Sequence, residues 1–248
     1  MRNAFTFNGI SSADLKLAIQ KLPARPVPKQ RQQTYVVPGR SGSLHVTDGA
    51  FDSVVLSIDC VVTDLSLIPA ICQALQGSGK LWHSGLNITS TSQGNYFYQA
   101  TVINTSDLVR MSSKWRSFQV QFECQPFIYY PTYTVTHDNH NSGFESHIGT
   151  AFARPKIVVY GNGNLSFTIS RQEVSGSTTT VTYTVNNVSS YVTIDAETLT
   201  VYKGSTNKLP DFSSTDGDFP LLSPYLNVFP FLPQSTTKIE ITPNWRFL

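Results

Sequence analysis

The amino-acid sequence predicts a mainly β protein with one short helix, and three observations support this fold class. First, apolar and polar residues alternate strictly from Phe118 to Gln125, which is the period of a strand that buries one face. Second, from Arg154 onward short alternating segments are separated by turn residues at the roughly 8–12-residue spacing that is typical of a β-sandwich. Third, only residues 66–77 carry an apolar stripe with helical spacing.

In the first half of the chain, we expect strands wherever apolar residues recur at every second position. Pro126 has no N–H to donate, so we expect it to end the last of these strands. The helix is expected to begin at Ser66, whose hydroxyl is suited to cap it, and to end before Gly77. The strands expected in this half are Phe5–Ile10, Leu15–Ile19, Tyr35–Val37, Val54–Val62, Leu81–Trp82, Tyr96–Val102 and Phe118–Gln125.

Residues 136–150 are polar and poor in strong hydrophobes, so we expect them to link two domains. We expect residues 1–135 to form a β-sandwich-like domain and residues 151–248 to form a second β-sandwich. A chain of 248 residues is long enough for both. The strands expected in the second domain are Lys156–Tyr160, Leu165–Ile169, Val181–Val185, Val192–Ile194, Leu199–Lys203 and Ile239–Ile241.

The composition is poor in charge. Only 14% of the residues are charged, against the usual quarter, and the formal net charge is +2. Such a surface suits a β-rich protein that is partly buried in an assembly better than it suits a helical enzyme. Cys60, Cys72 and Cys124 lack metal-ligand spacing, and we expect three reduced thiols. No apolar run reaches the roughly 18 residues of a membrane span, so we expect no membrane insertion.

No pattern in the sequence favours catalysis, and none favours a metal or a cofactor. Residues 161–163 begin like a dinucleotide fingerprint but lack its third glycine. Ser41 lacks the glycine two positions later that a nucleophile elbow requires. His137, His140 and His147 share a polar segment that would not hold metal ligands rigidly. We therefore expect a protein that is not an enzyme and that binds neither a metal nor a cofactor.

One charge pattern stands out in the first domain. Residues 15–47 contain six basic residues and no acidic residue. Within this stretch, residues 22–31 hold three prolines and are expected to form an extended arm or long loop, followed by a tight turn at Pro38–Gly42. Such an arm can dock on an acidic neighbour, line a space through which nucleic acid passes, or simply be solvated. The sequence leaves these roles open.

A series of short motifs follows the same order as in a known family. In the first half they are Phe5–Gly9, Val37–Gly42, Asp48–Asp52, Leu75–Leu81 and Phe118–Phe127. In the second half they are Pro155–Ile157, Tyr160–Gly163, Asp195–Tyr202, Gly217–Pro220 and Lys238–Arg246. Taken together, the ordered set resembles the distal tail protein (Dit) family of phages with long non-contractile tails.

The resemblance implies a structural virion protein rather than an enzyme. In that family the N-terminal domains form a hexameric ring, single or in two stacked copies, with galectin-like C-terminal β-sandwiches on its periphery. The ring joins the tail tube protein to the tail-associated lysin or baseplate hub, and it provides a docking surface for the receptor-binding protein. Phage DNA passes through it without sequence-specific binding. The resemblance thus places the chain in the virion tail, after synthesis in the host bacterial cytoplasm. We expect these residues at the subunit interface: Arg25, Lys29, Arg31, Tyr35 and Arg40.

An alternative function is a carbohydrate-binding module that recognises host cell-wall saccharide through the C-terminal β-sandwich. The chain leaves no room for the inserted carbohydrate-binding module of longer family members, which makes direct host binding the weaker expectation.

Overall fold

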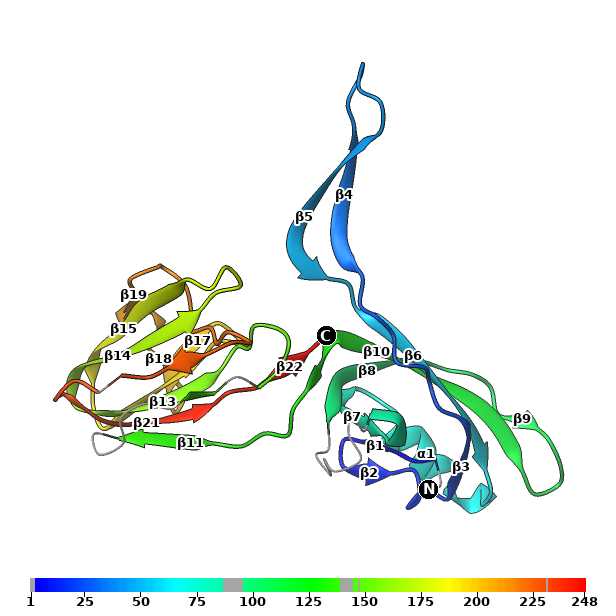
Figure 1. Ribbon diagram of the computed structural model, residues 1–248. Helices are drawn as coiled ribbons and strands as arrows, with labels where there is room; N and C mark the ends of the chain where they lie inside the picture. The colour runs from blue at the N-terminus through cyan, green and yellow to red at the C-terminus, as the bar shows by residue number, and fades with distance from the viewer. Residues whose placement is uncertain (1–2, 87–95, 139–144, 147, 231) are drawn as a thin grey trace. The chain divides into compact units, whose positions relative to one another are not determined.

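The computed structural model describes residues 3–86, 96–138, 145–146, 148–230 and 232–248. The chain divides into two compact units, of which unit 1 comprises Met1–Tyr129 with Leu248 and unit 2 comprises Tyr130–Phe247. Both units consist mostly of strands, and α1 is the single α-helix within the described ranges (Figure 1). The predicted mainly β fold with one short helix is therefore confirmed. No helix in these ranges is long and apolar enough to cross a membrane.

Unit 1 contains one large antiparallel sheet, a short helix and a separate hairpin. The strands of the sheet lie in the order β2-β1-β7-β8-β10-β6-β3, and β9 pairs with β10. The elements are β1 (Phe5–Phe7), β2 (Ile10–Ser11), β3 (Leu17–Lys21), β4 (Gln30–Val36), β5 (Ser43–Phe51), β6 (Val54–Val62), the 3₁₀ turn η1 (Leu65–Leu67), α1 (Ile68–Ala74), β7 (Ser78–His83), the 3₁₀ turn η2 (Ser84–Leu86), β8 (Phe97–Thr105), β9 (Val109–Arg110) and β10 (Arg116–Tyr129).

The sheet of unit 1 is strongly curved. Because β7 and β8 separate β1 from β10, a flat sheet would hold these two strands about 14 Å apart. Yet the ring of Phe122 on β10 lies 5.2 Å from that of Phe7 and 6.1 Å from that of Phe5. The sheet therefore curls around its own apolar face, and the buried Ile71 and Leu75 of the α1 segment add to the same core.

The alternation predicted for residues 118–125 is confirmed, but the expectation that Pro126 ends the strand is wrong. The even-numbered residues from 118 to 124 are buried on one face, and β10 continues to Tyr129. Pairing with β6 ends at Cys124, and pairing with β8 shifts register between Cys124 and Ile128. Pro126 lies inside this irregularity, where its missing N–H interrupts no continuous ladder.

The helical segment begins at Asp64 rather than at Ser66. The Asp64 carboxylate accepts a hydrogen bond from the backbone N–H of Ser66 at 3.1 Å and one from its hydroxyl at 2.7 Å. Lys16 donates to the same carboxylate at 2.8 Å, and these bonds lower the pKa of Asp64 to about 2. A carboxylate is ionised at neutral pH and accepts more strongly than a hydroxyl, so Asp64 takes the capping position.

Unit 2 is a β-sandwich of two antiparallel sheets. One sheet has the order β11-β21-β13-β16-β17-β18 and the other has the order β12-β20-β14-β15-β19. The elements are β11 (Val135–Asp138), β12 (Glu145–Ser146), β13 (Lys156–Gly161), β14 (Gly163–Gln172), β15 (Thr178–Val188), β16 (Tyr191–Asp195), β17 (Thr200–Lys203), β18 (Thr206–Asn207), the 3₁₀ turn η3 (Leu209–Asp211), β19 (Phe212–Ser214), β20 (Asn227–Val228), β21 (Thr236–Thr242) and β22 (Arg246–Phe247).

Side chains from both sheets of unit 2 form one apolar core. Trp245 closes it and donates its indole N–H to the hydroxyl of Tyr133 at 2.8 Å. Gly161 allows β13 to pass close to the backbone at Ser235, because φ is +153° there and a Cβ would overlap the Ser235 carbonyl oxygen. The core residues on the strands are Ile157, Val159, Leu165, Phe167, Ile169, Val181, Tyr183, Val185, Val188, Val192, Ile194, Val201, Ile239 and Ile241.

Part of the segment expected to be a linker belongs to the sandwich. In β11, Val135–Asp138 pairs with β21. His137 is only 1% exposed, and its Nε2 lies 3.1 Å from the carbonyl oxygen of Pro230. His140 and His147 lie outside the described residues, and within the described part of the chain no group of residues is arranged to hold a metal ion.

Candidate subunit interface

The most exposed feature of unit 1 is the hairpin of β4 and β5, which pair only with each other (Figure 1). We call residues 30–51 the arm. Every residue from Arg31 to Gly49 is exposed, so the arm has no core of its own. Because a two-stranded hairpin is marginally stable in water by itself, the arm gains most from a partner that covers it.

The arm has one apolar face. Tyr35 pairs with Leu44 in the register, and Val46 lies two residues further along β5, so these three side chains point to the same side. They are 49%, 39% and 47% exposed, and Val37, which directly follows β4, is 41% exposed. A row of apolar side chains this accessible is typical of a surface that a partner covers.

Three of the five predicted interface residues make contacts at the base of the arm. Arg25 precedes β4, and its guanidinium donates to the carbonyl oxygen of Leu248 at 2.9 Å. The carbonyl oxygen of Lys29 accepts the N–H of Asp52 at 2.9 Å, which closes the hairpin. On β4, Arg31 Nε lies 3.4 Å from the carboxylate of Asp52. These contacts order the point at which the arm leaves unit 1.

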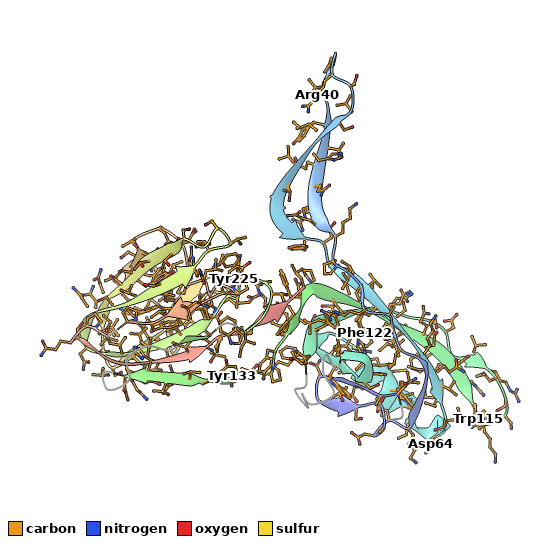
Figure 2. All side chains as sticks on the ribbon, in the orientation of Figure 1. Arg40, Asp64, Trp115, Phe122, Tyr133 and Tyr225 are labelled. Carbon is orange, nitrogen blue, oxygen red and sulfur yellow. The ribbon has the colours of Figure 1, made fainter. Side chains whose placement is uncertain are left out.

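The other two predicted residues lie further out on the arm. The Tyr35 hydroxyl donates to the side chain of Gln33, and the ring of Tyr35 remains on the apolar face. Arg40 lies in the turn at the free end of the arm (Figure 2). Its guanidinium has no hydrogen bond or ion pair with any residue that the structure describes. Tyr35 and Arg40 are therefore the predicted residues that are free to meet another molecule.

Two further contacts fix the base of the arm to β10. The rings of Phe51 and Phe127 meet edge to face with centroids 5.8 Å apart. Just beyond the arm, the hydroxyl of Ser53 donates to the Glu123 carboxylate at 2.6 Å. The arm is thus held at its base by an edge-to-face aromatic contact and by hydrogen bonding, while residues 31–49 are exposed.

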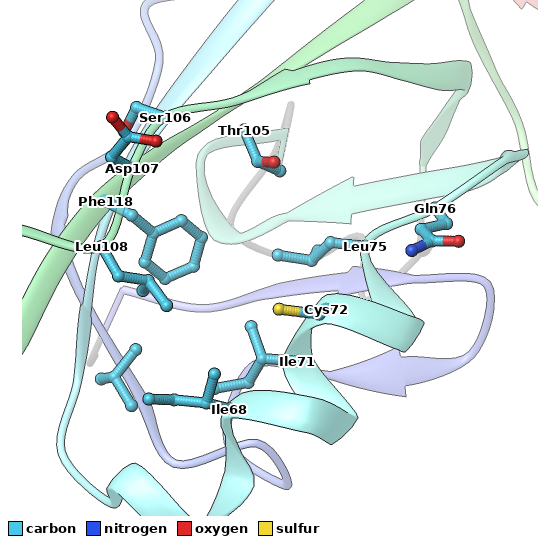
Figure 3. Close-up of a pocket in the computed structure, with 11 residues that line it drawn as sticks. Ile68, Ile71, Cys72, Leu75, Gln76, Thr105, Ser106, Asp107, Leu108 and Phe118 are labelled. Atoms are coloured by element: carbon cyan, nitrogen blue, oxygen red, sulfur yellow. The ribbon is translucent and has the colours of Figure 1, made fainter.

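An apolar groove lies beside α1 in the same unit. Its volume is about 330 Å³, and Figure 3 shows Ile68, Ile71, Cys72 and Leu75 facing Leu108 and Phe118 across it. The thiol of Cys72 is exposed there. Asp107 lies at the rim, and its carboxylate has no ion-pair or hydrogen-bond partner among the described residues. The groove therefore combines an open apolar floor with one unneutralised negative charge.

Sequence reasoning missed this groove. Its helical side is the apolar stripe predicted for residues 66–77, and the stripe alone did not indicate that part of it lines a groove. Leu108 follows the acidic Asp107 just after β8 and gave no periodic signal. One signal was available in the sequence. The helix is short but carries several apolar residues, so it cannot bury all of them, and Cys72 beside the buried Ile71 is one that stays exposed.

The outer face of β10 is lined with amides and carboxylates. Gln119 donates to Asp59 of β6 at 2.8 Å, and Gln121 donates to Gln119 at 3.2 Å. Glu123 continues the row, and the odd-numbered positions from 117 to 125 of this strand hold no basic residue. The face is therefore hydrophilic and weakly negative.

The outer face of one sheet of unit 2 carries a pair of tyrosines. The rings of Tyr160 on β13 and Tyr191 on β16 lie 6.1 Å apart. Lys238 Nζ lies 4.2 Å from the centre of the Tyr160 ring, and the Tyr160 hydroxyl donates to Glu240 at 2.9 Å, which raises the pKa of Tyr160. Aromatic faces flanked by charged hydrogen-bonding groups can bind sugars as well as protein.

The buried cysteines and the buried histidine of unit 1 are uncharged at neutral pH. Burial raises the pKa of the Cys60 and Cys124 thiols to about 12, and it lowers the pKa of His83 to about 4. Cys60 and Cys124 thus act as small apolar side chains, as the sequence predicted, whereas Cys72 is exposed.

Comparisons with known proteins identify the fold. No protein-family model matches the sequence, and no curated protein matches it. Among solved structures, the Dit protein of phage SPP1 matches over 100% of both chains with a TM-score of 0.69 and 14% sequence identity. It is described as a paradigm of the hub adsorption apparatus of phages that infect Gram-positive bacteria.

Chains of the phage P2 baseplate in its activated conformation also match. The structure with Ca gives a TM-score of 0.52 at 10% identity, over 99% of this chain and 100% of that chain. The structure with Sr gives 0.51 at 9% identity, over 98% and 99%. The whole chain therefore has a Dit-type fold, which confirms the resemblance found in the sequence at the level of fold.

Proposed function

We propose that this chain is a structural protein of a phage tail, and that six copies form a ring-shaped distal tail hub. The likeness of its fold to SPP1 Dit over the full length supports this role. The observation that carries the proposal is the arm, whose apolar face is left uncovered in the single chain. A surface of this kind is expected to be buried between subunits.

The ring would be closed by head-to-tail contacts, because the arm and the surface that receives it are different parts of the subunit. Arg25, Lys29 and Arg31 set the base of the arm, while Tyr35 and Arg40 contact the neighbouring subunit. The role is geometric and requires neither catalysis nor a bound cofactor.

The outer face of β10 is the surface that we assign to the ring channel. DNA is held by basic side chains that displace its counterions. The row formed by Gln119, Gln121 and Glu123 offers none, so DNA would slide past a hydrated, weakly negative wall. Replacing Gln119 and Gln121 with lysine is expected to make the assembled ring retain DNA in a gel-shift assay, whereas the parent ring releases it. Equal retention by both would contradict this assignment.

The ring would join the tail tube to the tail-associated lysin or baseplate hub, with unit 2 available to the receptor-binding protein. The protein would then be made in the bacterial cytoplasm and reside in the virion. One ring or two stacked rings are compatible with these roles.

Light scattering after size exclusion tests the ring directly. Six subunits of 27.5 kDa each give about 165 kDa, and two stacked rings give twice that mass. We expect one of these masses to dominate as the concentration is raised. A 27.5 kDa species at every concentration would contradict the proposal.

Limited proteolysis provides a second test. Trypsin is expected to cut after Lys29, Arg31 or Arg40 in dispersed subunits, because these residues are accessible. In the assembled ring, the same bonds are expected to be cut much more slowly. Equal cleavage rates in the two states would show that the arm is not buried by assembly.

A second candidate function is sugar binding by unit 2, which the tyrosine pair on its outer face favours. A glycan array with the full chain tests it, with Tyr160→Ala and Tyr191→Ala as variants that remove the platform. Tyr225→Ala is the matched control, because Tyr225 is 42% exposed elsewhere on unit 2. Loss of a signal in the first two variants alone would support sugar binding, and the absence of any signal would exclude the arrayed sugars as ligands.

A further inference from the structure

Two surfaces of unit 1 have complementary chemistry. The arm presents Tyr35, Leu44 and Val46 on one face, and Val37, which directly follows β4, is exposed beside them in sequence. The turn carries the unpaired guanidinium of Arg40. The groove beside α1 presents an apolar floor, and its rim carries the unpaired carboxylate of Asp107. Neither charge has an ion-pair partner among the described residues of its own chain.

We propose that the outer end of the arm of one subunit docks in the α1 groove of the neighbouring subunit, with Val37 entering the apolar floor and Arg40 pairing with Asp107. The inference rests on the proposed ring and names the surface that receives the arm. The occupant is a second copy of this chain.

The dimensions and the charges support this pairing. A cavity of about 330 Å³ is at the lower end of the roughly 300–1,000 Å³ that ligand pockets occupy, so it suits a few side chains rather than a whole strand. No basic residue lines the groove, so a cation brought by the arm meets no repulsion from its walls. Docking would also desolvate the Arg40–Asp107 pair partly, which strengthens their attraction.

The symmetry of the contact supports it as well. Arm and groove lie on the same subunit but are different surfaces, so each subunit gives its arm to one neighbour and receives an arm from the other. Such a heterologous contact generates a closed ring when its rotation closes. Pairing of two arms with each other would instead give an isologous dimer.

The native thiol in the groove provides the decisive experiment. Cys72 is exposed on the groove, whereas Cys60 and Cys124 are buried. In the full-length protein, Val37→Cys is expected to form a disulfide with Cys72 of the next subunit under mild oxidation. Non-reducing electrophoresis would then show a ladder of covalent oligomers up to six subunits, and adding Cys72→Ser would abolish it.

Val36→Cys is the matched control, because Val36 is the adjacent residue, is 79% exposed and points to the opposite face of the hairpin. It is expected to cross-link at least about ten-fold less efficiently than Val37→Cys. Leu44→Cys lies on the docking face and repeats the test with a second position. Cross-linking of the control to the same extent, or no cross-link from either Val37→Cys or Leu44→Cys in an assembled ring, would overturn the inference.

A charge exchange tests the ion pair without cysteines. Arg40→Asp and Asp107→Arg are each expected to weaken assembly by about ten-fold or more in dissociation constant, and the double variant is expected to recover most of the loss. No recovery in the double variant would count against the pairing. Light scattering separates the two levels of failure: a parent chain that stays monomeric refutes the ring and the inference together, whereas a ring without the cross-link refutes the docking site alone.

Discussion

Lowering the pH is expected to destabilise unit 1 through His83. This residue ends β7 and is 2% exposed, and its ring stacks on Tyr98 with centroids 6.5 Å apart. Its Nδ1 accepts the backbone N–H of Gly85 at 3.2 Å. Protonation of Nδ1 would place two donors against each other and bury a charge. Burial accordingly lowers the pKa of His83 to about 4, from 6.5 in an unfolded chain.

The direction of the effect follows from the proton balance. Between pH 6.5 and 4 the unfolded chain binds this proton and the folded chain does not, so the stability contributed by neutral His83 is complete above pH 6.5 and is lost as the pH falls toward 4. At about pH 5 the unfolded imidazole is almost fully protonated and the folded one only about a tenth. The resulting loss of unfolding free energy is about 2 kcal/mol relative to about pH 7.5.

Urea unfolding at a fixed subunit concentration measures this loss. In a Trp245→Phe background, fluorescence reports on Trp82 and Trp115, which both lie in unit 1. In His83→Phe, which keeps an aromatic ring but has no proton to bind, the difference between the two pH values is expected to shrink by about 2 kcal/mol. His45→Gln, an exposed site on the arm, is the control. An unchanged pH dependence in His83→Phe would refute the reasoning.

Three further substitutions probe the two units and the arm. Phe122→Ala removes the ring at the centre of the curved sheet and is expected to cost unit 1 about 3–5 kcal/mol in urea unfolding. Gly161→Ala forces a Cβ against the Ser235 carbonyl oxygen, so Trp245 fluorescence should report a destabilised unit 2 with an unchanged transition in unit 1. Phe51→Ala removes the contact with Phe127, worth about 0.5–1.5 kcal/mol, and is expected to weaken assembly several-fold in light scattering while lowering the unfolding free energy of unit 1 by no more than that amount.

Much of the fold was predictable because period-two alternation reports directly on burial. The strands around Val54–Val62 and Phe118–Cys124 lie where the pattern put them, since each buries one face. A strand that buries neither face shows no such alternation, so the pattern does not predict it. The arm is almost fully exposed, so the prolines of residues 22–31 predicted an extended segment before β4, but no pattern predicted the long hairpin that follows it.

The candidate site was predictable only in part, for a related reason. Arg40 was named from a run of like charge, and it does lie at the free end of the arm. Asp107 and Leu108 were not named, because a groove is made by segments distant in sequence and depends on the curvature of the sheet. Likewise, Pro126 was expected to end a strand because local hydrogen-bonding rules do not foresee a bulge that absorbs it.

The irregularity at Pro126 makes the arm sensitive to chain length in β10. Phe127 and Glu123 lie on the outer side of this strand, and both hold the base of the arm. Because neighbouring residues of a strand point to opposite sides, deleting Gln125 would turn Phe127 inward and bring an apolar neighbour out in its place. The arm would keep its own sequence and still lose its attachment. The number of residues in β10 thus sets which of its side chains face the arm. Through that attachment it determines whether a subunit can reach its neighbour.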